Sequence, residues 1–596
     1  MTTTRNPHIR NIAIIAHVDH GKTTLVDHML RQGLALKSSQ GSTDRLMDSM
    51  DLERERGITI AAKNCSVEYK GVKINILDTP GHADFGGEVE RALKMVDGVI
   101  LLVDSSEGPL PQTRFVLKKA LEARLSIALV INKIDRQDAR PEEVLNDVYD
   151  LFIDLDADES QIEFPVLYAI GRDGIAKKTL DGPEGDLVAL FDTILDVIPG
   201  PSYTEGDPLQ MLVTNVSYSD YLGRLAIGRV FNGNVKKGDA LVRIKSDGSA
   251  ANLKLSSVQV YKGVQFEQAD TAMAGEIVIL AGAEEVEIGD TICTKDFPKA
   301  LPRINVDEPT MSVSISACTS PFAGQEGEFV QSRKILERLE KEALYNVAIK
   351  VEVDPNGESF SVKGRGEFQM AILIEQMRRE GYELTVGRPK ILFKEINGEL
   401  LEPIEHLFID CDEQYMGVVT EKLSVRKGKM LNLVNHGSGR VRLEFSIPSR
   451  GLIGYRGEFL TDTRGTGLMN SLVSGYEPHR GDFTSRKSGS MVADREGLAV
   501  AYGLYHLEPR GRLFVLPNDK LYKGMIIGEH NRDNDLHVNA SKEKKLSNMR
   551  STGKDEHIQL TPITPLTIEL ALEFIRDDEQ MEVTPKSIRL RKTSLK

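Results

Sequence analysis

Residues 16–24 read AHVDHGKTT and follow an apolar run, IAII, at residues 12–15. The segment after them carries apolar residues at helical spacing. A strand, a tight loop ending in Gly-Lys-Thr and a helix form an arrangement in which backbone N–H groups cradle a phosphate. Lys22 would then reach the β- and γ-phosphates, and the Thr23 hydroxyl would bind Mg²⁺. One residue departs from the usual pattern, because Ala16 replaces its first glycine.

Two later segments carry oxygen ligands that suit the same metal ion. Residues 78–82, DTPGH, follow another apolar strand. Asp78 can hold Mg²⁺ through water, and Gly81 lets the backbone approach the γ-phosphate. In residues 56–60, RGITI, the hydroxyl of Thr59 would complete the Mg²⁺ shell. The sequence therefore predicts a phosphate and magnesium site at the ends of neighbouring strands.

A third segment predicts which base is bound. Residues 132–135 read NKID and again follow an apolar strand. Asn132 offers a donor and an acceptor, and Asp135 can accept from the ring N–H and the exocyclic amine of guanine. Adenine lacks that pair of donors, so this segment selects a guanine nucleotide.

Together these segments resemble the translational GTPases of the elongation-factor superfamily. The resemblance implies that the ribosome positions His82 beside the attacking water, and that Val18 and Ile58 form a hydrophobic gate in front of it. It also implies Mg²⁺ and a monovalent cation near Asp19. One departure is Ile-Gly at 170–171, where the family usually has Ser-Ala. The phosphate-binding set is Asp19, His20, Gly21, Lys22, Thr23, Thr24 and Gly81; the guanine-binding set is Asn132, Lys133 and Asp135; the metal set is Thr23, Thr59 and, through water, Asp78.

Composition limits the class of protein. A chain of 596 residues predicts about four or five domains. The net charge of −14 argues against nucleic-acid affinity over the whole surface, so RNA contacts must come from local basic segments. The four cysteines are far apart in sequence and predict reduced thiols of a cytoplasmic protein. No apolar run is long enough to span a bilayer, so no membrane partner is expected.

The pattern along the chain predicts a multidomain α/β and β protein. Alternating strands and helices come first, then short strands typical of a barrel, then two strand–helix–strand units. Near the C-terminus, residues 497–505 and 566–574 are predicted as strand-like runs. The predicted domains are a P-loop GTPase domain (1–201), a β-barrel (202–303), two ferredoxin-like α+β domains (304–390 and 391–479) and a mixed, mainly-β C-terminal domain (480–596).

Residues 447–456, IPSRGLIGYR, and 463–467, TRGTG, complete a resemblance to the BipA/TypA family that covers essentially the whole chain. It implies a cytoplasmic, monomeric GTPase that binds the 70S ribosome and the large subunit. Such a protein hydrolyses GTP to GDP and phosphate and acts in translation regulation and large-subunit assembly under stress or cold. Guanosine tetraphosphate is a further implied ligand. The alternative is an elongation factor 4-like or general elongation factor acting in each round of translation.

The segment 531–554 is polar and contains few apolar residues, which predicts a loop without a core of its own. Its cations can neutralise phosphates, although a merely solvated loop has the same composition. The resemblance implies contact with 23S rRNA and with the acceptor arm of A-site tRNA. A second basic run follows at 586–596. The RNA-binding candidates are Arg532, Lys542, Lys544, Lys545, Arg550 and Lys554.

Overall fold

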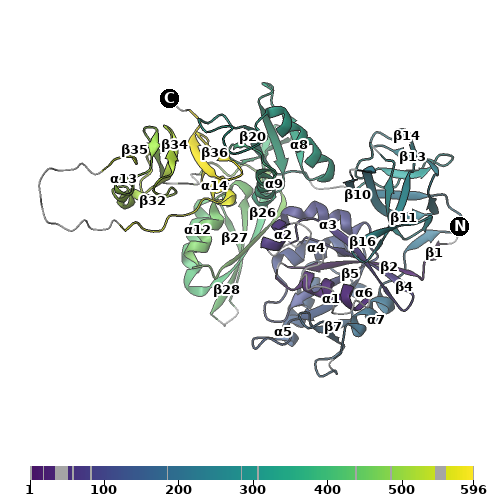
Figure 1. Ribbon diagram of the computed structural model, residues 1–596. Helices are drawn as coiled ribbons and strands as arrows, with labels where there is room; N and C mark the ends of the chain where they lie inside the picture. The colour runs from purple at the N-terminus through teal and green to yellow at the C-terminus, as the bar shows by residue number, and fades with distance from the viewer. Residues whose placement is uncertain are drawn as a thin grey trace, which may run out of the picture. The chain divides into compact units, whose positions relative to one another are not determined.

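The computed structural model divides the chain into two compact units, Met1–Asp307 with Leu344–Ala348, and Glu308–Ala343 with Ile349–Lys596 (Figure 1). No helix in the described part of the chain is long and apolar enough to cross a membrane. The described residues are 3–17, 19–33, 51–56, 59–80, 83–183, 185–219, 221–283, 285–304, 308–396, 398–435, 439–483, 486, 488–543 and 559–594.

The first unit contains a mainly parallel sheet, with seven strands over the described residues in the order β3-β4-β2-β5-β6-β7-β8. Its edge strands β3 and β8 run antiparallel to their neighbours. The strands are β2 Ile9–Ala16, β3 Lys63–Tyr69, β4 Val72–Asp78, β5 Gly98–Asp104, β6 Ser126–Asn132, β7 Val166–Ile170 and β8 Ile175–Lys177. Because β2, β4, β5 and β6 are parallel, their carboxyl ends lie at one edge of the sheet, where open α/β sheets bind ligands.

Helices cover both faces of this sheet because its central strands are apolar on both sides. Along β2, Ile12 and Ile14 share a core with α1 and α7, whereas Ala13 and Ile15 share another with α3, α4 and α5. The helices are α1 Lys22–Gly33, α2 Asp51–Arg56, α3 Gly86–Leu93, α4 Pro111–Glu122, α5 Pro141–Asp154, α6 Glu159–Ile162 and α7 Val188–Val197.

An antiparallel, barrel-like sheet follows in the same unit, as predicted. Within the described residues it has eight strands, in the order β14-β13-β19-β10-β11-β18-β15-β16, and β12 pairs separately with β17. Two short strands, β1 (Thr3–Arg5) and β9 (Ser202–Thr204), pair with each other and so join the N-terminal segment to the chain that leads into this barrel-like sheet. The strands are β10 Gln210–Ser219, β11 Gly223–Asn232, β12 Asn234–Lys236, β13 Ala240–Ile244, β14 Ala250–Lys254, β15 Ser257–Lys262, β16 Gln265–Gln268, β17 Thr271–Met273, β18 Ile277–Ala281 and β19 Thr291–Thr294.

The second unit contains two copies of the split βαβ arrangement, and this part of the prediction is confirmed. In each copy the second strand pairs with the third, the third with the first and the first with the fourth. The first copy comprises β20 Met311–Ala317, α8 Ser332–Tyr345, β21 Lys350–Val353, β22 Ser359–Gly364, α9 Glu367–Arg379 and β23 Leu384–Val386. The second comprises β26 Glu399–Asp412, α10 Met416–Val425, β27 Lys429–Asn435, β28 Arg440–Pro448, α12 Tyr455–Asp462 and β29 Leu468–Pro478.

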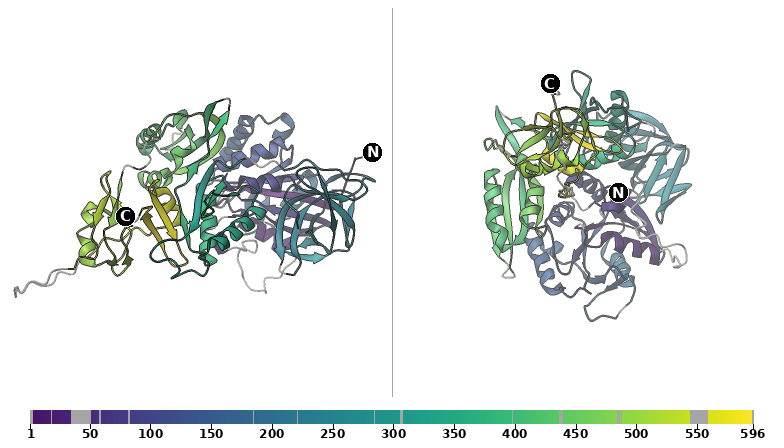
Figure 2. Two further views of the ribbon diagram at one scale, coloured as in Figure 1. Left: turned by 90° about the horizontal axis from the view of Figure 1, so that it is seen from above. Right: turned by 60° about the vertical axis from the view of Figure 1, so that its left-hand side comes forward.

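The C-terminal region continues the sheet of the first copy. Strand β36 (Glu579–Val583) pairs with β23, β37 (Ile588–Lys592) with β36, and β34 (Met525–His530) with β37. Figure 2 shows the yellow pair β36 and β37 beside the teal-green strands. The regions predicted as separate domains at 304–390 and 480–596 therefore share one sheet and one hydrophobic core, and the second region has a further core around Met491, Ile527 and Val538.

Two predicted strand-like runs are wrong. Residues 566–574 contain α14 (Ile568–Phe574), because Thr567 caps the helix by accepting from Leu570 N and Ile568, Ala571 and Leu572 bury one face. In 497–505 only β31 (Gly497–Leu498) forms a strand, and α13 (Ala501–Tyr505) follows. Periodicity alone cannot distinguish a strand from a buried helix in an apolar run this short, so the pattern was ambiguous.

Candidate functional site: a nucleotide site at the carboxyl edge of the sheet

The predicted phosphate-binding loop connects β2 to α1. Its backbone takes left-handed conformations at Asp19 (φ 65°) and Gly21 (φ 90°). A Cβ atom at Gly21 would lie 2.6 Å from the Asn132 amide nitrogen, so the loop needs glycine here on both counts. In the first turn of α1, Thr23 is half-buried and Thr24 is exposed. Val18 lies outside the described residues.

Three of the predicted site residues meet where β2 and β4 end. Lys22 Nζ lies 2.9 Å from Asp78 Oδ1 and also donates to the Thr79 carbonyl. The Thr59 hydroxyl donates to Asp78 Oδ2 at 3.3 Å. Thr59 is 4% exposed, Lys22 8% and Asp78 0%. The structure therefore brings the predicted lysine, aspartate and threonine into one buried cluster.

The donor set of this cluster fits a small hard cation. A carboxylate and hydroxyl oxygens are the ligands that Mg²⁺ prefers, and a lysine beside them suits phosphate oxygens. Thr59 and Thr23 would supply hydroxyl oxygens, Asp78 would hold Mg²⁺ through water, and Lys22 would supply the positive charge. Three other predicted residues of this region, Ile58, Gly81 and His82, lie outside the described residues.

At the other end of the site, Asn132 joins two loops. Its side-chain N–H donates to the His20 carbonyl at 2.8 Å, and its carbonyl accepts from Gly171 N at 2.8 Å. A Cβ atom at Gly171 would lie 3.0 Å from that carbonyl, so glycine fits this position closely. The Ile-Gly departure therefore keeps the backbone contact between the two loops.

The predicted base-reading carboxylate has a neighbour that the sequence did not reveal. Arg172 lies 3.5 Å from Asp135 and 3.0 Å from Asp173. Asp135 is 32% exposed and Arg172 76% exposed, so their ion pair is accessible to water and salt.

Asp104, at the end of β5, is a further residue that sequence reasoning missed. Its carboxylate lies 2.8 Å from Lys133 Nζ and accepts from Ser106 N and Oγ at 2.8 and 2.7 Å. Burial alone would raise the pKa of Asp104, but the hydrogen bonds from Lys133 and Ser106 outweigh it and lower the pKa to about 2. Its position after an apolar strand parallel to β2 was the available signal.

His20 occupies a buried position beside Asp104. The backbone N–H of Asp104 donates to His20 Nδ1 at 3.3 Å, and His20 Nε2 lies 3.4 Å from Glu107. The hydrogen bond from His20 lowers the pKa of Glu107. The imidazole thus links the phosphate loop to the end of β5.

The C-terminal basic segment only partly fits the prediction of a loop without a core. Arg532 and Lys542 are exposed, but β35 (Leu536–Val538) pairs with β30 (Gly489–Ala493), and Val538 is buried. Pairing with β30 therefore orders a strand and buries Val538 in a segment whose composition predicted only a solvated loop. The other predicted cations, Lys544, Lys545, Arg550 and Lys554, lie outside the described residues.

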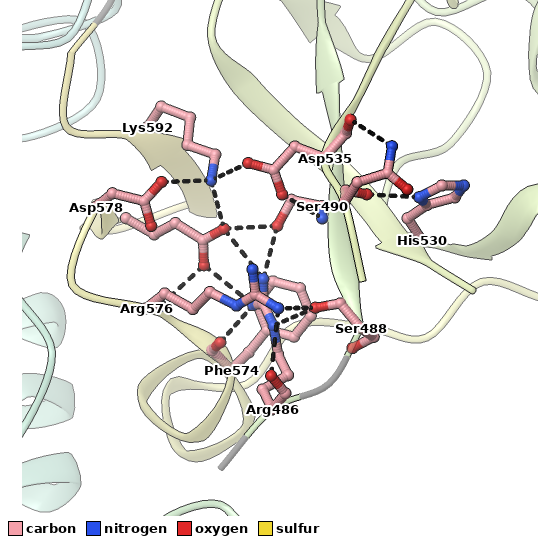
Figure 3. A network of polar contacts seen from close by, with 11 residues as sticks. Arg486, Ser488, Ser490, His530, Asp535, Phe574, Arg576, Asp578 and Lys592 are labelled. Atoms are coloured by element: carbon pink, nitrogen blue, oxygen red, sulfur yellow. Dashed lines mark hydrogen bonds and ion pairs between the residues drawn. The ribbon is translucent and has the colours of Figure 1, made fainter. Parts of the chain in front are cut away.

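The second basic run has three cations that pair with carboxylates within the fold: Arg589, Arg591 and Lys592. Its other cations are Lys586, which is exposed, and Lys596, which lies outside the described residues. Lys592 lies 2.5 Å from Asp535, 2.8 Å from Asp578 and 3.0 Å from Glu579, as Figure 3 shows for the polar network around it. Arg589 pairs with Glu326 and Arg591 with Glu582. These cations are therefore structural, because each is satisfied by a carboxylate of the same unit.

Four family models match consecutive parts of the chain. They are the elongation factor Tu GTP binding domain (residues 7–200), elongation factor G domain 2 (208–295), the elongation factor G C-terminus (399–487) and the TypA/BipA C-terminal domain (488–596).

Curated relatives match almost end to end. Proteins named large ribosomal subunit assembly factor BipA are 49% identical in Bacillus subtilis strain 168 and 50% identical in Synechocystis, each over 588 residues. These matches cover 98% and 99% of this chain, and 96% and 98% of the relatives. A solved structure from Thermus thermophilus has a TM-score of 0.56 at 17% identity, covers 80% of this chain and 98% of its own, and supports the fold.

Proposed function

We propose that this chain, which belongs to the TypA/BipA family of translational GTPases, acts in assembly of the large ribosomal subunit. The observation that carries the nucleotide chemistry is the buried cluster of Lys22, Asp78 and Thr59. The step to the large subunit rests on the name that the relatives carry and on their identity to this chain over nearly its whole length.

In the proposed site the loop 19–24 and Gly81 surround the phosphates, with Lys22 supplying the positive charge. Thr23, Thr59 and water held by Asp78 bind Mg²⁺. When bound, Mg²⁺ neutralises charge on the β- and γ-phosphate oxygens. This arrangement needs no covalent intermediate, since positioning and charge stabilisation carry the reaction.

Asp135 reads guanine, Asn132 holds the loops around the base, and Lys133 completes the guanine-binding set. His82 positions the attacking water once the ribosome is bound. In the free protein, Val18 and Ile58 keep the His82 side chain away from that water. These three assignments come from the family resemblance, as does a monovalent cation near Asp19.

For the ribosome, we assign Arg532 and Lys542 to contact with 23S rRNA and A-site tRNA, together with Lys544, Lys545, Arg550 and Lys554. The protein would act as a cytoplasmic monomer that binds GTP, GDP and guanosine tetraphosphate.

Sedimentation separates this function from the alternative, an elongation factor 4-like or general elongation factor. The protein, loaded with a non-hydrolysable GTP analogue, is mixed with 70S ribosomes, free large subunits and large-subunit precursors. We expect binding to large-subunit particles as well as 70S ribosomes, and precursors that accumulate in cells lacking the protein. Binding confined to 70S ribosomes, with normal subunit profiles in those cells, would support the alternative.

The RNA assignment has its own test in a salt series. Replacing Lys542 and Lys545 with Ala should weaken ribosome binding and flatten its salt dependence, because each lost phosphate contact removes about 0.7–0.9 from the log–log slope. The matched control replaces the exposed pair Lys236 and Lys237. Equal slopes in both double variants would exclude this segment as the RNA contact.

A further inference from the structure

The segment that carries Thr59 is attached to α2 by a buried carboxylate. Glu53 has 0% exposure, and its Oε1 accepts from Ile60 N at 2.9 Å and from Ala61 N at 3.4 Å. Its other oxygen pairs with Lys63 at the start of β3. Glu53 therefore joins helix α2, the backbone just after Thr59 and the first residue of β3.

A second carboxylate holds the same segment from α3. Glu88 accepts from Ala62 N at 3.4 Å and pairs with the buried Arg91 one turn later on its helix. Burial lowers the pKa of Arg91 to about 10. Of the two attachments, the one from Glu53 is shorter and closer in sequence to Thr59, so it controls where Thr59 can lie.

Burying a carboxylate is costly unless its oxygens are hydrogen-bonded or paired with a cation. Here Lys63 and the backbone N–H groups of Ile60 and Ala61 together meet that requirement. With Ile60 held, the preceding hydroxyl of Thr59 stays 3.3 Å from Asp78. Release of the segment would leave the Glu53 charge without those backbone donors, which opposes movement of Thr59.

We propose that Glu53 is a positioning residue that holds Thr59 ready for Mg²⁺ and the γ-phosphate, and so sets the preference of the protein for GTP over GDP. This inference rests on the proposed nucleotide function. GDP lacks the γ-phosphate that orders such segments in GTPases, so its affinity does not depend on where Thr59 lies.

The test compares affinities of the ribosome-free protein for GDP and for a non-hydrolysable GTP analogue. Glu53→Ala should weaken analogue binding by about tenfold, the usual effect of losing a hydrogen bond to a charged group, and leave GDP affinity within about twofold. Glu53→Gln keeps an oxygen that can accept from Ile60 N and should lose less. The matched control is Asp51→Ala on the same helix, because Asp51 is 82% exposed.

Unaltered GDP affinity also shows that the variant is folded. If Glu53→Ala does not fold, the same comparison of affinities is made with Glu53→Gln. Amide hydrogen exchange at Ile60 and Ala61 gives a reading independent of nucleotide, and should be faster in both Glu53 variants. Equal loss of GDP and analogue affinity, or no loss of either, would overturn the role of Glu53.

The variant Thr59→Ala distinguishes an error in the role of Glu53 from an error in the proposed metal site. If Thr59→Ala removes the preference for the analogue while the Glu53 variants keep it, only the positioning role is wrong. If Thr59→Ala also leaves the preference intact, the assignment of Thr59 to the metal is wrong as well.

Discussion

In the proposed nucleotide site, the charged side chains at the phosphate end and at the base end are paired in different ways. Lys22 and Asp78 are both almost fully buried and pair with each other. Asp135 and Arg172 are partly or largely exposed, and their ion pair is longer, at 3.5 Å. A buried pair is costly to break on one side, whereas an exposed pair contributes little. Substitutions at the phosphate end should therefore affect folding and binding together, and those at the base end binding alone.

The largest effect is expected for Lys22→Ala. It leaves the buried carboxylate of Asp78 without its cation, and breaking such a pair commonly costs about 3–5 kcal/mol of stability. Nucleotide affinity should fall by about a hundredfold or more, because a charge-assisted contact to phosphate is lost. Thermal unfolding and isothermal titration with GDP measure the two effects.

The double variant Lys22→Ala with Asp78→Asn removes the unpaired charge. It should recover part of the lost stability and none of the lost affinity. If stability does not recover, the pairing with Asp78 is not what makes Lys22 structurally important.

Asp135→Asn should change the base that is bound while leaving the fold intact. The carboxylate that accepts from guanine becomes a group that can donate, which suits xanthine. We expect GTP affinity to fall by about a hundredfold, since a site built to pair a polar group rejects a mismatch strongly. Competition between GTP and xanthosine triphosphate measures the switch. The control is Asp138→Asn, which alters a 61% exposed carboxylate nearby, and an equal effect there would refute the base-reading role.

Asp104→Asn tests the connection between the two ends. The lowered pKa of Asp104, about 2, means that its charged form stabilises the fold above the unfolded pKa of about 3.9. That contribution is lost as the pH falls through about 2. The melting temperature of the variant should lie below that of the wild type at pH 7, and the gap should close between about pH 4 and pH 2. A gap that is constant with pH would mean that charge is irrelevant at this position.

The smallest effect is expected for Arg172→Leu. Removing the cation frees Asp135 for guanine, so GDP affinity should rise by no more than about threefold at low salt. The rise should vanish at high salt, because exposed ion pairs are screened. Arg114→Leu, which breaks another exposed pair of the same domain, is the control. A large loss of affinity would show instead that Arg172 supports the bound base.

Much of the fold was predictable where the pattern is local. The apolar strands that end at Asp78 and Asn132 and the two split βαβ units are present as predicted. The helix α14 and the strand β35 were not predicted, because short segments with mixed patterns depend on what packs against them. The pairing of β36 with β23 joins residues about two hundred apart in sequence, so no local pattern could indicate it.

By itself the sequence determined the chemistry of the site, since the identities of Lys22, Asp78, Asn132 and Asp135 and their places at strand ends set what each can bind. Tertiary structure alone decided which charges meet. Glu53 looked like one acid among several in a charged helix, and its burial against Ile60 depends on how α2 packs. The same holds for Lys592, whose charge is neutralised by carboxylates from other segments. Side-chain chemistry is a local property, whereas burial and charge pairing arise only when distant segments come together.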